Sequence, residues 1–190
     1  DHAGQIITAL IIQLSQLAAQ AEATANPLAP ALHHLHEVAQ EGLDDLRRLV
    51  HELRPAVLDD LGLGPAVRWY VDTYVTPAGL TAHVEIHGLG NRLPSDVETV
   101  AFRIVQEALT NVLRHARARE VRVRLDRRGE MLLVMVRDDG VGFDPEEVDR
   151  RSFGIAGMRE RAELVGGTVQ ILSVPGVGTT VLARLPVTGA

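Results

Sequence analysis

The stretch from Phe102 to His115 reads FRIVQEALTNVLRH, and the rest of the chain is organised around it. Apolar residues recur through it and just before it with a period close to 3.6 residues, which predicts an amphipathic helix; they are Val97, Ala101, Ile104, Ala108 and Val112. Ser95 is the predicted N-cap of this helix, and Glu98, three residues later, completes a capping-box pattern.

Two polar residues interrupt this helix, Glu107 and Asn111. They are four residues apart, so they lie one above the other on one helix face. A carboxylate and an amide placed in this way present the oxygen ligands that a hard cation such as Mg²⁺ prefers. An acid and an amide at this spacing are more often a solvated helix face, so the pair alone does not identify a metal site.

Three glycine-rich stretches follow the helix. They read DDGVGF at 138–143, GIAGMRER at 154–161 and PGVGTT at 175–180. The first comes one residue after the apolar run MLLVMV, the second opens a predicted helix, and the third lies between two predicted strands. The central helix therefore precedes a series of turns in which the backbone can come close to a ligand.

These four segments resemble, in the same order, the N box, G1 box, G2 box and glycine–threonine box of one ATPase superfamily. Gyrase, the heat-shock chaperone ATPases, histidine kinases and mismatch-repair proteins share this superfamily. A single D-x-G-x-G motif would be weak, but four ordered boxes within residues 96–186 are specific. The resemblance implies an α+β chain whose ATP-binding domain is a two-layer α/β sandwich of Bergerat type.

The resemblance also implies a role for each box. Asp138, the first acid of the G1 box, would accept a hydrogen bond from the exocyclic amino group of adenine, and Thr179 would join the same network. Asn111 would bind Mg²⁺ through its side-chain oxygen. Glu107 would either orient a water ligand of the metal or assist proton transfer, and the sequence does not choose between these roles.

Other residues of the boxes would contact ATP. Glycines of the G1 box would let the backbone approach the nucleotide, and those of the G2 box would free backbone N–H groups for phosphate, although simple loop flexibility also explains them. Arg114 stands where the family often has lysine and keeps a positive charge for phosphate. His115 either approaches the phosphates or is a helix C-terminal histidine favoured by the dipole. The expected ATP contacts also include Gly140, Gly142, Gly154, Gly157 and Met158.

The front of the chain predicts two long helices. Residues 1–25 and 30–54 carry apolar residues at alternating steps of three and four, a heptad pattern, with Asn26-Pro27 between them. An antiparallel hairpin of this kind buries only one side, so we expect it to pair with a second copy into a homodimeric four-helix bundle. The histidines at 33, 34 and 36 are expected to be polar helix surface rather than a metal site.

Two motifs in this half resemble one group of sensor histidine kinases. DHAGQ at 1–5 resembles part of its H-[DE]-x-x-G-Q motif, and LRPAVLDDLGL at 53–63 resembles its L-R-P-x-x-L-x-x-L-G-L linker. In that group the phosphate-accepting histidine immediately precedes the acid aligned with Asp1, and Asp1 would polarise its ring. The acceptor is therefore expected just before this sequence begins, and His2 is one register too late.

Gln5 lies four residues after Asp1 on the same helix face. In the resembled group this pair supports dephosphorylation of the partner regulator, because an amide can orient a water towards an aspartyl phosphate. The alternative is a polar heptad position that sets helix register.

The expected organisation has three parts. Residues 1–55 form the dimerisation and phosphotransfer hairpin, residues 56–66 a hinge-like linker, and residues 67–190 the catalytic ATP-binding domain. Within that domain the pattern predicts a helix from Pro65 to Tyr74, another from Ile155 to Val165, and a candidate lid from Gly142 to Phe153. The predicted strands are 81–87, 121–125, 131–136, 169–173 and 180–185.

The function implied is that of the catalytic core of a sensor histidine kinase. It would transfer the γ-phosphoryl group of ATP to a histidine and then to an aspartate of a response regulator. One alternative is a serine kinase acting as an anti-sigma factor, a class that lacks the hairpin and the linker. The other is a non-enzymatic, nucleotide-gated interaction module, against which the intact Glu107, Asn111 and Asp138 argue.

The composition of the chain excludes several other classes of protein. The 190 residues carry a formal net charge of −6, which argues against a general nucleic-acid binder, and contain no cysteine, which excludes disulfides and thiolate metal sites. No stretch approaches the ~20 apolar residues of a membrane span. Because the sequence begins at Asp1, we expect a cytoplasmic fragment of a longer protein, with any membrane anchor in segments outside it.

Overall fold

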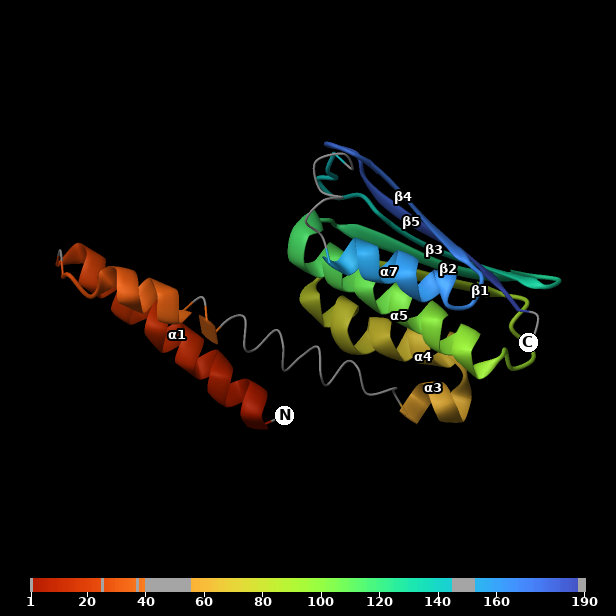
Figure 1. Ribbon diagram of the computed structural model, residues 1–190, viewed down its shortest axis with the longest axis horizontal. Coiled ribbons are helices and arrows are strands. Elements are labelled where there is room, and N and C mark those ends of the chain that lie inside the picture. Colours follow the sequence, from red (N-terminus) through yellow and green to blue (C-terminus); the bar gives the residue numbers. More distant parts are fainter. Residues whose placement is uncertain (1, 25, 37, 40–55, 145–152, 188–190) are drawn as a thin grey trace. The chain divides into compact units, whose positions relative to one another are not determined.

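The computed structural model describes residues 2–24, 26–36, 38–39, 56–144 and 153–187 (Figure 1). The chain forms two compact units, Asp1–Arg54 and Pro55–Ala190. None of the helices within the described ranges is long and apolar enough to cross a membrane.

The described part of the first unit consists of two helical segments. Helix α1 spans His2–Ala23, and a second helical segment covers residues 29–36 and 38–39. The turn between them is closed by Asn26, whose N–H donates to Ala21 O at 2.8 Å and whose Oδ1 accepts from Leu28 N at 3.0 Å. His33 Nε2 lies 2.9 Å from Glu22 Oε1 across this turn, so the two segments lie side by side as the sequence predicts.

The second unit contains a five-stranded mixed sheet. Its order is β1-β2-β3-β5-β4, with β1 and β2 parallel and the other neighbours antiparallel. The strands are β1 (Thr81–His87), β2 (Glu120–Arg128), β3 (Met131–Asp138), β4 (Thr168–Val174) and β5 (Gly178–Pro186). All five contain the predicted strands. Alternate residues of β2, Val121, Val123 and Leu125, are buried, so the alternation in the sequence correctly identifies the inner face.

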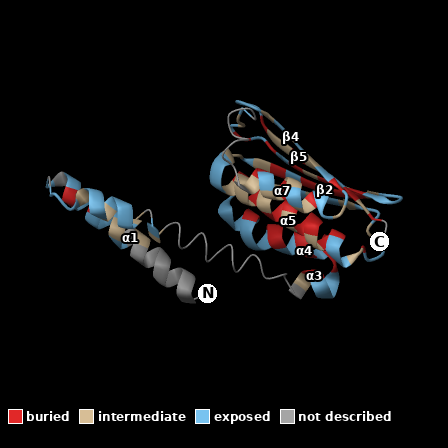
Figure 2. Ribbon diagram, in the orientation of Figure 1, coloured by how far each residue is buried: buried red, intermediate tan, exposed pale blue. Residues whose placement is uncertain are grey.

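Helices cover one face of this sheet, which gives the expected two-layer sandwich (Figure 1). They are α3 (Ala56–Leu61), α4 (Leu63–Tyr70), α5 (Ser95–Asn111) and α7 (Phe153–Glu163). A π-helical turn (Val71–Val75) and a 3₁₀ turn (Thr76–Ala78) prolong α4, and a π-helical turn (Val112–Ala116) prolongs α5. Figure 2 shows buried residues concentrated along α4 and α5, where Ala101, Ile104 and Leu109 are fully buried.

The predicted capping box at the start of α5 is wrong. Pro94 is the N-cap, Ser95 is already helical, and the Glu98 N–H donates to Pro94 O at 2.9 Å. The Glu98 carboxylate is buried and accepts instead from Arg92 Nη2 at 2.8 Å and from Leu93 N at 3.3 Å. A buried carboxylate requires such partners, and the guanidinium supplies the opposite charge.

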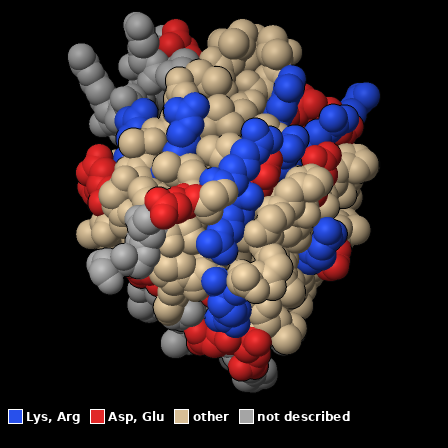
Figure 3. All heavy atoms as spheres, turned by 90° about the vertical axis from the view of Figure 1, so that its right-hand side faces the viewer, with Lys and Arg blue, Asp and Glu red and all other residues tan. Residues whose placement is uncertain are grey.

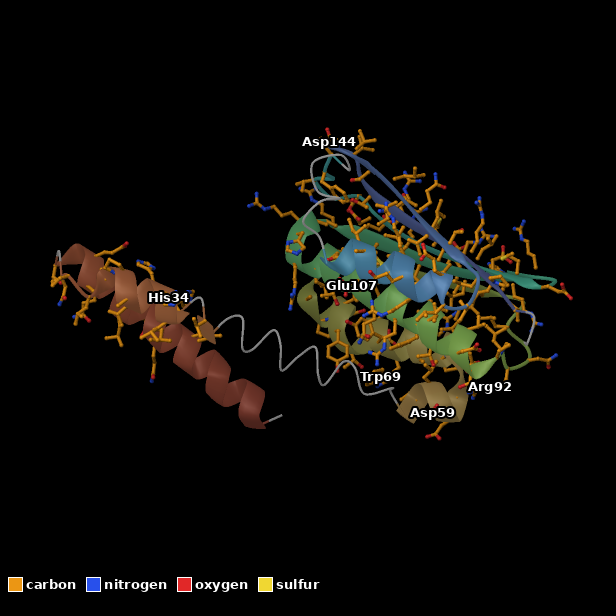
Figure 4. All side chains as sticks on the ribbon, in the orientation of Figure 1. His34, Asp59, Trp69, Arg92, Glu107 and Asp144 are labelled. Atoms are coloured by element: carbon orange, nitrogen blue, oxygen red, sulfur yellow. The ribbon has the colours of Figure 1, made fainter. Side chains whose placement is uncertain are left out.

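The Arg92 side chain also reaches the end of α3 (Figure 4). Its guanidinium donates to Asp59 O at 2.9 Å and to Leu58 O at 3.2 Å, two carbonyls near a helix end. Residues 56–66, predicted as a linker, form α3 and the start of α4, and Leu58 and Leu63 are buried in the core of the second unit. The predicted helix at Pro65 begins earlier, at Leu63, directly after Gly62 with its φ of 83°.

Arginine and acidic side chains lie beside one another on the face shown in Figure 3. On β2, Asp126 Oδ2 lies 2.8 Å from Arg128 Nη2 and 3.1 Å from Arg124 Nη2, and Arg122 pairs with Glu120. The hydrogen bond from Arg128 is the main cause that lowers the pKa of Asp126. Much of the positive charge of β2 is therefore balanced on the strand itself.

Candidate functional site

A cavity of about 400 Å³ lies in the second unit, where α5 and α7 meet the sheet. Six of the residues predicted to contact ATP line it: Asn111, His115, Asp138, Gly142, Met158 and Thr179. Most of the remaining wall is apolar and includes Val141, Phe143, Ile155, Ile171 and Val181. An apolar cavity with a few polar groups is typical of a small-molecule site, and its size suits a planar ring system.

Asp138 and Asp139 have different environments although they are adjacent. Asp138 is buried at the cavity, and its Oδ1 accepts from Gly140 N at 2.8 Å. Burial is the main cause that raises the pKa of Asp138 above its ordinary value. The Asp139 carboxylate is exposed and accepts hydrogen bonds from Arg119 N at 2.8 Å and from Glu120 N at 2.9 Å. The hydrogen bond from Glu120 N is the main cause that lowers the pKa of Asp139. Asp138 therefore faces the ligand cavity, whereas Asp139 fixes the start of β2.

The G1 box is joined to the end of α5 by its backbone. Ala116 is in the terminal turn of this helix, and its carbonyl accepts from Val141 N at 2.7 Å. A Cβ on Gly140 would lie 2.3 Å from this same oxygen, which is far inside van der Waals contact. Gly142 has a φ of 61°, and a Cβ there would lie 2.1 Å from Val174 O. Both glycines are thus required by close protein backbone, a reason that the sequence alone does not reveal.

The N box and the G2 box meet beside the cavity. Glu107 is half-buried on α5, and α7 begins directly against it (Figure 4). A Cβ on Gly154 would lie 2.1 Å from Glu107 Oε1 and 3.7 Å from Asn111 Nδ2. The start of α7 therefore lies next to both polar residues of the central helix.

Several predicted residues lie outside the cavity wall. Glu107, Arg114, Gly140, Gly154 and Gly157 are not among the described residues that line it. Gly140 and Gly154 lie immediately next to lining residues, and Arg114 is exposed on the terminal turn of α5. Asp1 and residues 145–152 of the predicted lid lie outside the described residues, and Gln5 is described only as part of α1.

The apolar wall was not predicted as part of the site. Val141 and Phe143 lie between and after the G1 glycines, and Ile155 follows the first glycine of the G2 box. Their positions inside the boxes were the available signal, since apolar residues next to turn glycines have few other places to pack. Ile171 and Val181 carry no such signal, because they look like ordinary inward residues of strands.

Family comparisons agree with this geometry. Residues 96–189 match the profile of the histidine kinase-, DNA gyrase B- and HSP90-like ATPases, and residues 1–58 match a histidine kinase profile. The chain belongs to the histidine kinase family. Its second unit therefore contains the ATP-binding domain of a histidine kinase.

Named relatives cover most of the chain. It is 37% identical over 157 residues to the signal transduction histidine-protein kinase/phosphatase DegS of Brevibacillus brevis, an alignment that covers 83% of the chain and 41% of DegS. It is 41% identical over 150 residues to the oxygen sensor histidine kinase NreB of Staphylococcus carnosus, covering 77% of the chain and 42% of NreB. The chain thus spans less than half the length of these relatives.

A solved structure shares the fold of this histidine kinase chain. The histidine kinase domain of the blue-light activated kinase from Erythrobacter litoralis EL346 aligns with a TM-score of 0.62 at 22% identity. The alignment covers 95% of the chain and 96% of that domain.

Proposed function

We propose that this chain is the catalytic core of a sensor histidine kinase that uses Mg²⁺ and ATP. The observation that carries the proposal is the buried Asp138 carboxylate at an apolar cavity lined by residues of the N, G1 and G2 boxes. An apolar wall favours the adenine ring, and a buried carboxylate is complementary to its amino group. Thr179 and Met158 lie at the same cavity, as this assignment requires.

Magnesium fits the residues present. Within the described ranges no three His, Asp or Glu side chains gather as a complete metal site. Mg²⁺ in kinases is held by one or two protein groups together with phosphate oxygens and water, so Asn111 would hold it with Glu107 beside it. When bound, the ion would neutralise phosphate charge, and Glu107 would orient a water or move a proton.

The phosphate end of the site would lie towards the start of α7. Gly154 allows this helix to begin against Glu107, and Gly157 lies in its first turns. Backbone N–H groups at a helix start can donate to phosphate oxygens. The accepting histidine would precede Asp1, and the Asp1 carboxylate would polarise its imidazole ring. A phosphorus–nitrogen bond would form while the bond from the γ-phosphorus to the bridging oxygen breaks, and ADP would leave.

Calorimetry of the chain with ATP tests the nucleotide and metal assignments together. We expect ATP to bind more tightly with Mg²⁺ than with EDTA, because the metal links Asn111 to the phosphates. Asn111→Ala should reduce the affinity for Mg·ATP by about tenfold and leave the affinity in EDTA nearly unchanged. An equal loss under both conditions would contradict a metal-linked role for Asn111.

The proposed partner of the first unit is a second copy of the chain. Several large apolar side chains remain exposed on the hairpin, including Leu17 at 50% and Leu35 at 51%, and both belong to the predicted heptad seams. We expect the chain to sediment as a homodimer. Leu17→Glu combined with Leu35→Glu should give monomers that bind ATP with unchanged affinity.

The control for this prediction exchanges two exposed polar residues of the same helices, Gln13→Glu and His34→Glu, which should leave the dimer intact. A wild-type chain that sediments as a monomer at micromolar concentration would contradict the dimer.

The second proposed partner is the receiver domain of a response regulator, whose aspartate would receive the phosphoryl group. The chain would also remove phosphate from that aspartate, with Gln5 orienting the attacking water. DegS, whose name includes both kinase and phosphatase, supports both directions. The helical hairpin and the linker motif favour this function over an anti-sigma-type serine kinase. Asn111 and Asp138 line a formed cavity, and Glu107 lies against Gly154 beside it, which favours this function over a module without catalysis.

A further inference from the structure

A buried tyrosine joins the C-terminal ends of α4 and α5, which pack against each other (Figure 1). Tyr70 is the last residue of α4 and is 3% exposed, and its ring stands edge-on to that of Phe102 with the ring centroids 6.0 Å apart. Its hydroxyl lies 3.3 Å from Thr110 Oγ1 on α5. A buried tyrosine hydroxyl requires a hydrogen-bond partner, and Thr110 provides one.

The direction of this hydrogen bond follows from the other contact of Thr110. The Thr110 hydroxyl donates its single proton to Gln106 O at 2.8 Å, so it accepts from Tyr70. Burial is the main cause that raises the pKa of Tyr70, and the charge of Glu107 adds to the rise. The Tyr70 hydroxyl therefore keeps its proton at neutral pH and remains a donor.

The turn of α5 that Tyr70 contacts carries both polar residues of the N box. The hydrogen bond from Thr110 to Gln106 spans the turn that contains Glu107, and Asn111 follows as the last residue before α5 becomes π-helical. Consecutive side chains lie about 100° apart around a helix, so Thr110 can face α4 while Asn111 lines the cavity. A rotation of this turn about the axis of α5 would both break the contact with Tyr70 and turn the Asn111 amide away from the cavity.

We infer that Tyr70 is a positioning residue for the Mg²⁺ site: by donating to Thr110 it holds the last α-helical turn of α5 in the rotation that presents Asn111 to the cavity. This inference rests on the proposed binding of Mg·ATP and adds a residue of α4 that acts through α5. Because Tyr70 is also part of the core, a role in stability alone is the competing explanation.

The test is calorimetry of the chain with ATP, once with Mg²⁺ and once with EDTA. Tyr70→Phe keeps the ring that packs on Phe102 and removes only the hydroxyl. It should weaken the binding of Mg·ATP by about threefold and leave the affinity in EDTA unchanged. The matched control is Tyr74→Phe, since Tyr74 is 42% exposed and its ring centroid lies 4.9 Å from that of Tyr70. This control should bind ATP as wild type does under both conditions.

Variants of Thr110 test the same hydrogen bond from the side of α5. Thr110→Val has no hydroxyl and should reproduce the loss seen in Tyr70→Phe, whereas Thr110→Ser keeps the hydroxyl and should bind Mg·ATP as wild type does. When Asn111→Ala is already present, Tyr70→Phe should cause no further loss, because its effect passes through Asn111.

A Tyr70→Phe chain with wild-type affinity for Mg·ATP, or with equal losses in Mg²⁺ and in EDTA, would overturn the inference and leave the proposed function intact. Losses that add in the double variant with Asn111→Ala would do the same. A wild-type chain whose ATP affinity does not rise with Mg²⁺ would overturn the proposed metal role and this inference together. If Tyr70→Phe fails to fold, Thr110→Val and Thr110→Ser decide the question in the same comparison.

Discussion

Asp138→Asn should weaken ATP binding by about 1–3 kcal/mol, or roughly fivefold to over a hundredfold in affinity. The substitution keeps the shape of the side chain and leaves an oxygen for Gly140 N–H, so the G1 turn can persist. It places an amide donor or a neutral oxygen where the carboxylate would accept from the adenine amino group. Isothermal calorimetry with Mg·ATP measures the change.

Asp139→Asn is the matched control. This neighbouring carboxylate is exposed and accepts from two backbone N–H groups of the β2 start, Arg119 and Glu120. Its substitution should leave the ATP affinity unchanged, with a small decrease in thermal stability. Equal ATP affinities for wild type and Asp138→Asn would remove Asp138 from the site.

The raised pKa of Asp138 adds a pH dependence to this comparison. As the pH falls through this raised pKa, the carboxyl gains a proton and becomes a poorer acceptor, so ATP affinity should begin to fall at a higher pH than for an exposed aspartate. Asp138→Asn should lack this component of the pH profile, whereas the titration of ATP itself is common to both proteins.

Gly140→Ala should have the second large effect, because its Cβ has no room. The added carbon would lie 2.3 Å from Ala116 O, 2.7 Å from Ala116 Cβ and 2.8 Å from Asp138 Oδ1. The G1 turn must move, which weakens the hydrogen bond from Val141 N to Ala116 O and displaces Asp138. We expect a loss of stability of about 1–3 kcal/mol together with loss of measurable ATP binding.

Gly90→Ala is the control for this substitution, since a Cβ there meets nothing within 4 Å and the residue does not have a left-handed φ. It should melt within about 1 °C of wild type if its effect on stability is near zero. A Gly140→Ala chain with wild-type melting temperature and ATP affinity would show that the G1 turn tolerates a side chain.

The sequence identified the residues whose chemistry or spacing is distinctive. The ordered boxes predicted that α5, the turn after β3 and the start of α7 would meet, and Gly154 does lie against Glu107. The alternation in β2 and the period of α5 predicted which faces would be buried. These features follow from local periodicity and from the special backbone freedom of glycine.

The features that the sequence did not reveal depend on tertiary contacts. The Glu98 carboxylate has the spacing of a capping box, yet Arg92 pairs with it instead, because burial of the carboxylate favours a charged partner. Ser173 looks like any strand serine until the register of β4 and β5 places it beside Thr179. Cross-strand register and loop approach are not encoded in short motifs, so such residues emerge only from the fold.

The most direct test of the central claim is labelling of the chain with γ-³²P-ATP after one histidine is added before Asp1. We expect phosphate on this chain that is stable in base and labile in acid, as a phosphorus–nitrogen bond should be. The same chain with alanine at the added position should remain unlabelled, and the histidine-extended chain carrying Asp138→Asn should be labelled more weakly than the histidine-extended wild type at limiting ATP. Equal labelling of the histidine and alanine forms, or labelling of neither while ATP binds, would contradict the account.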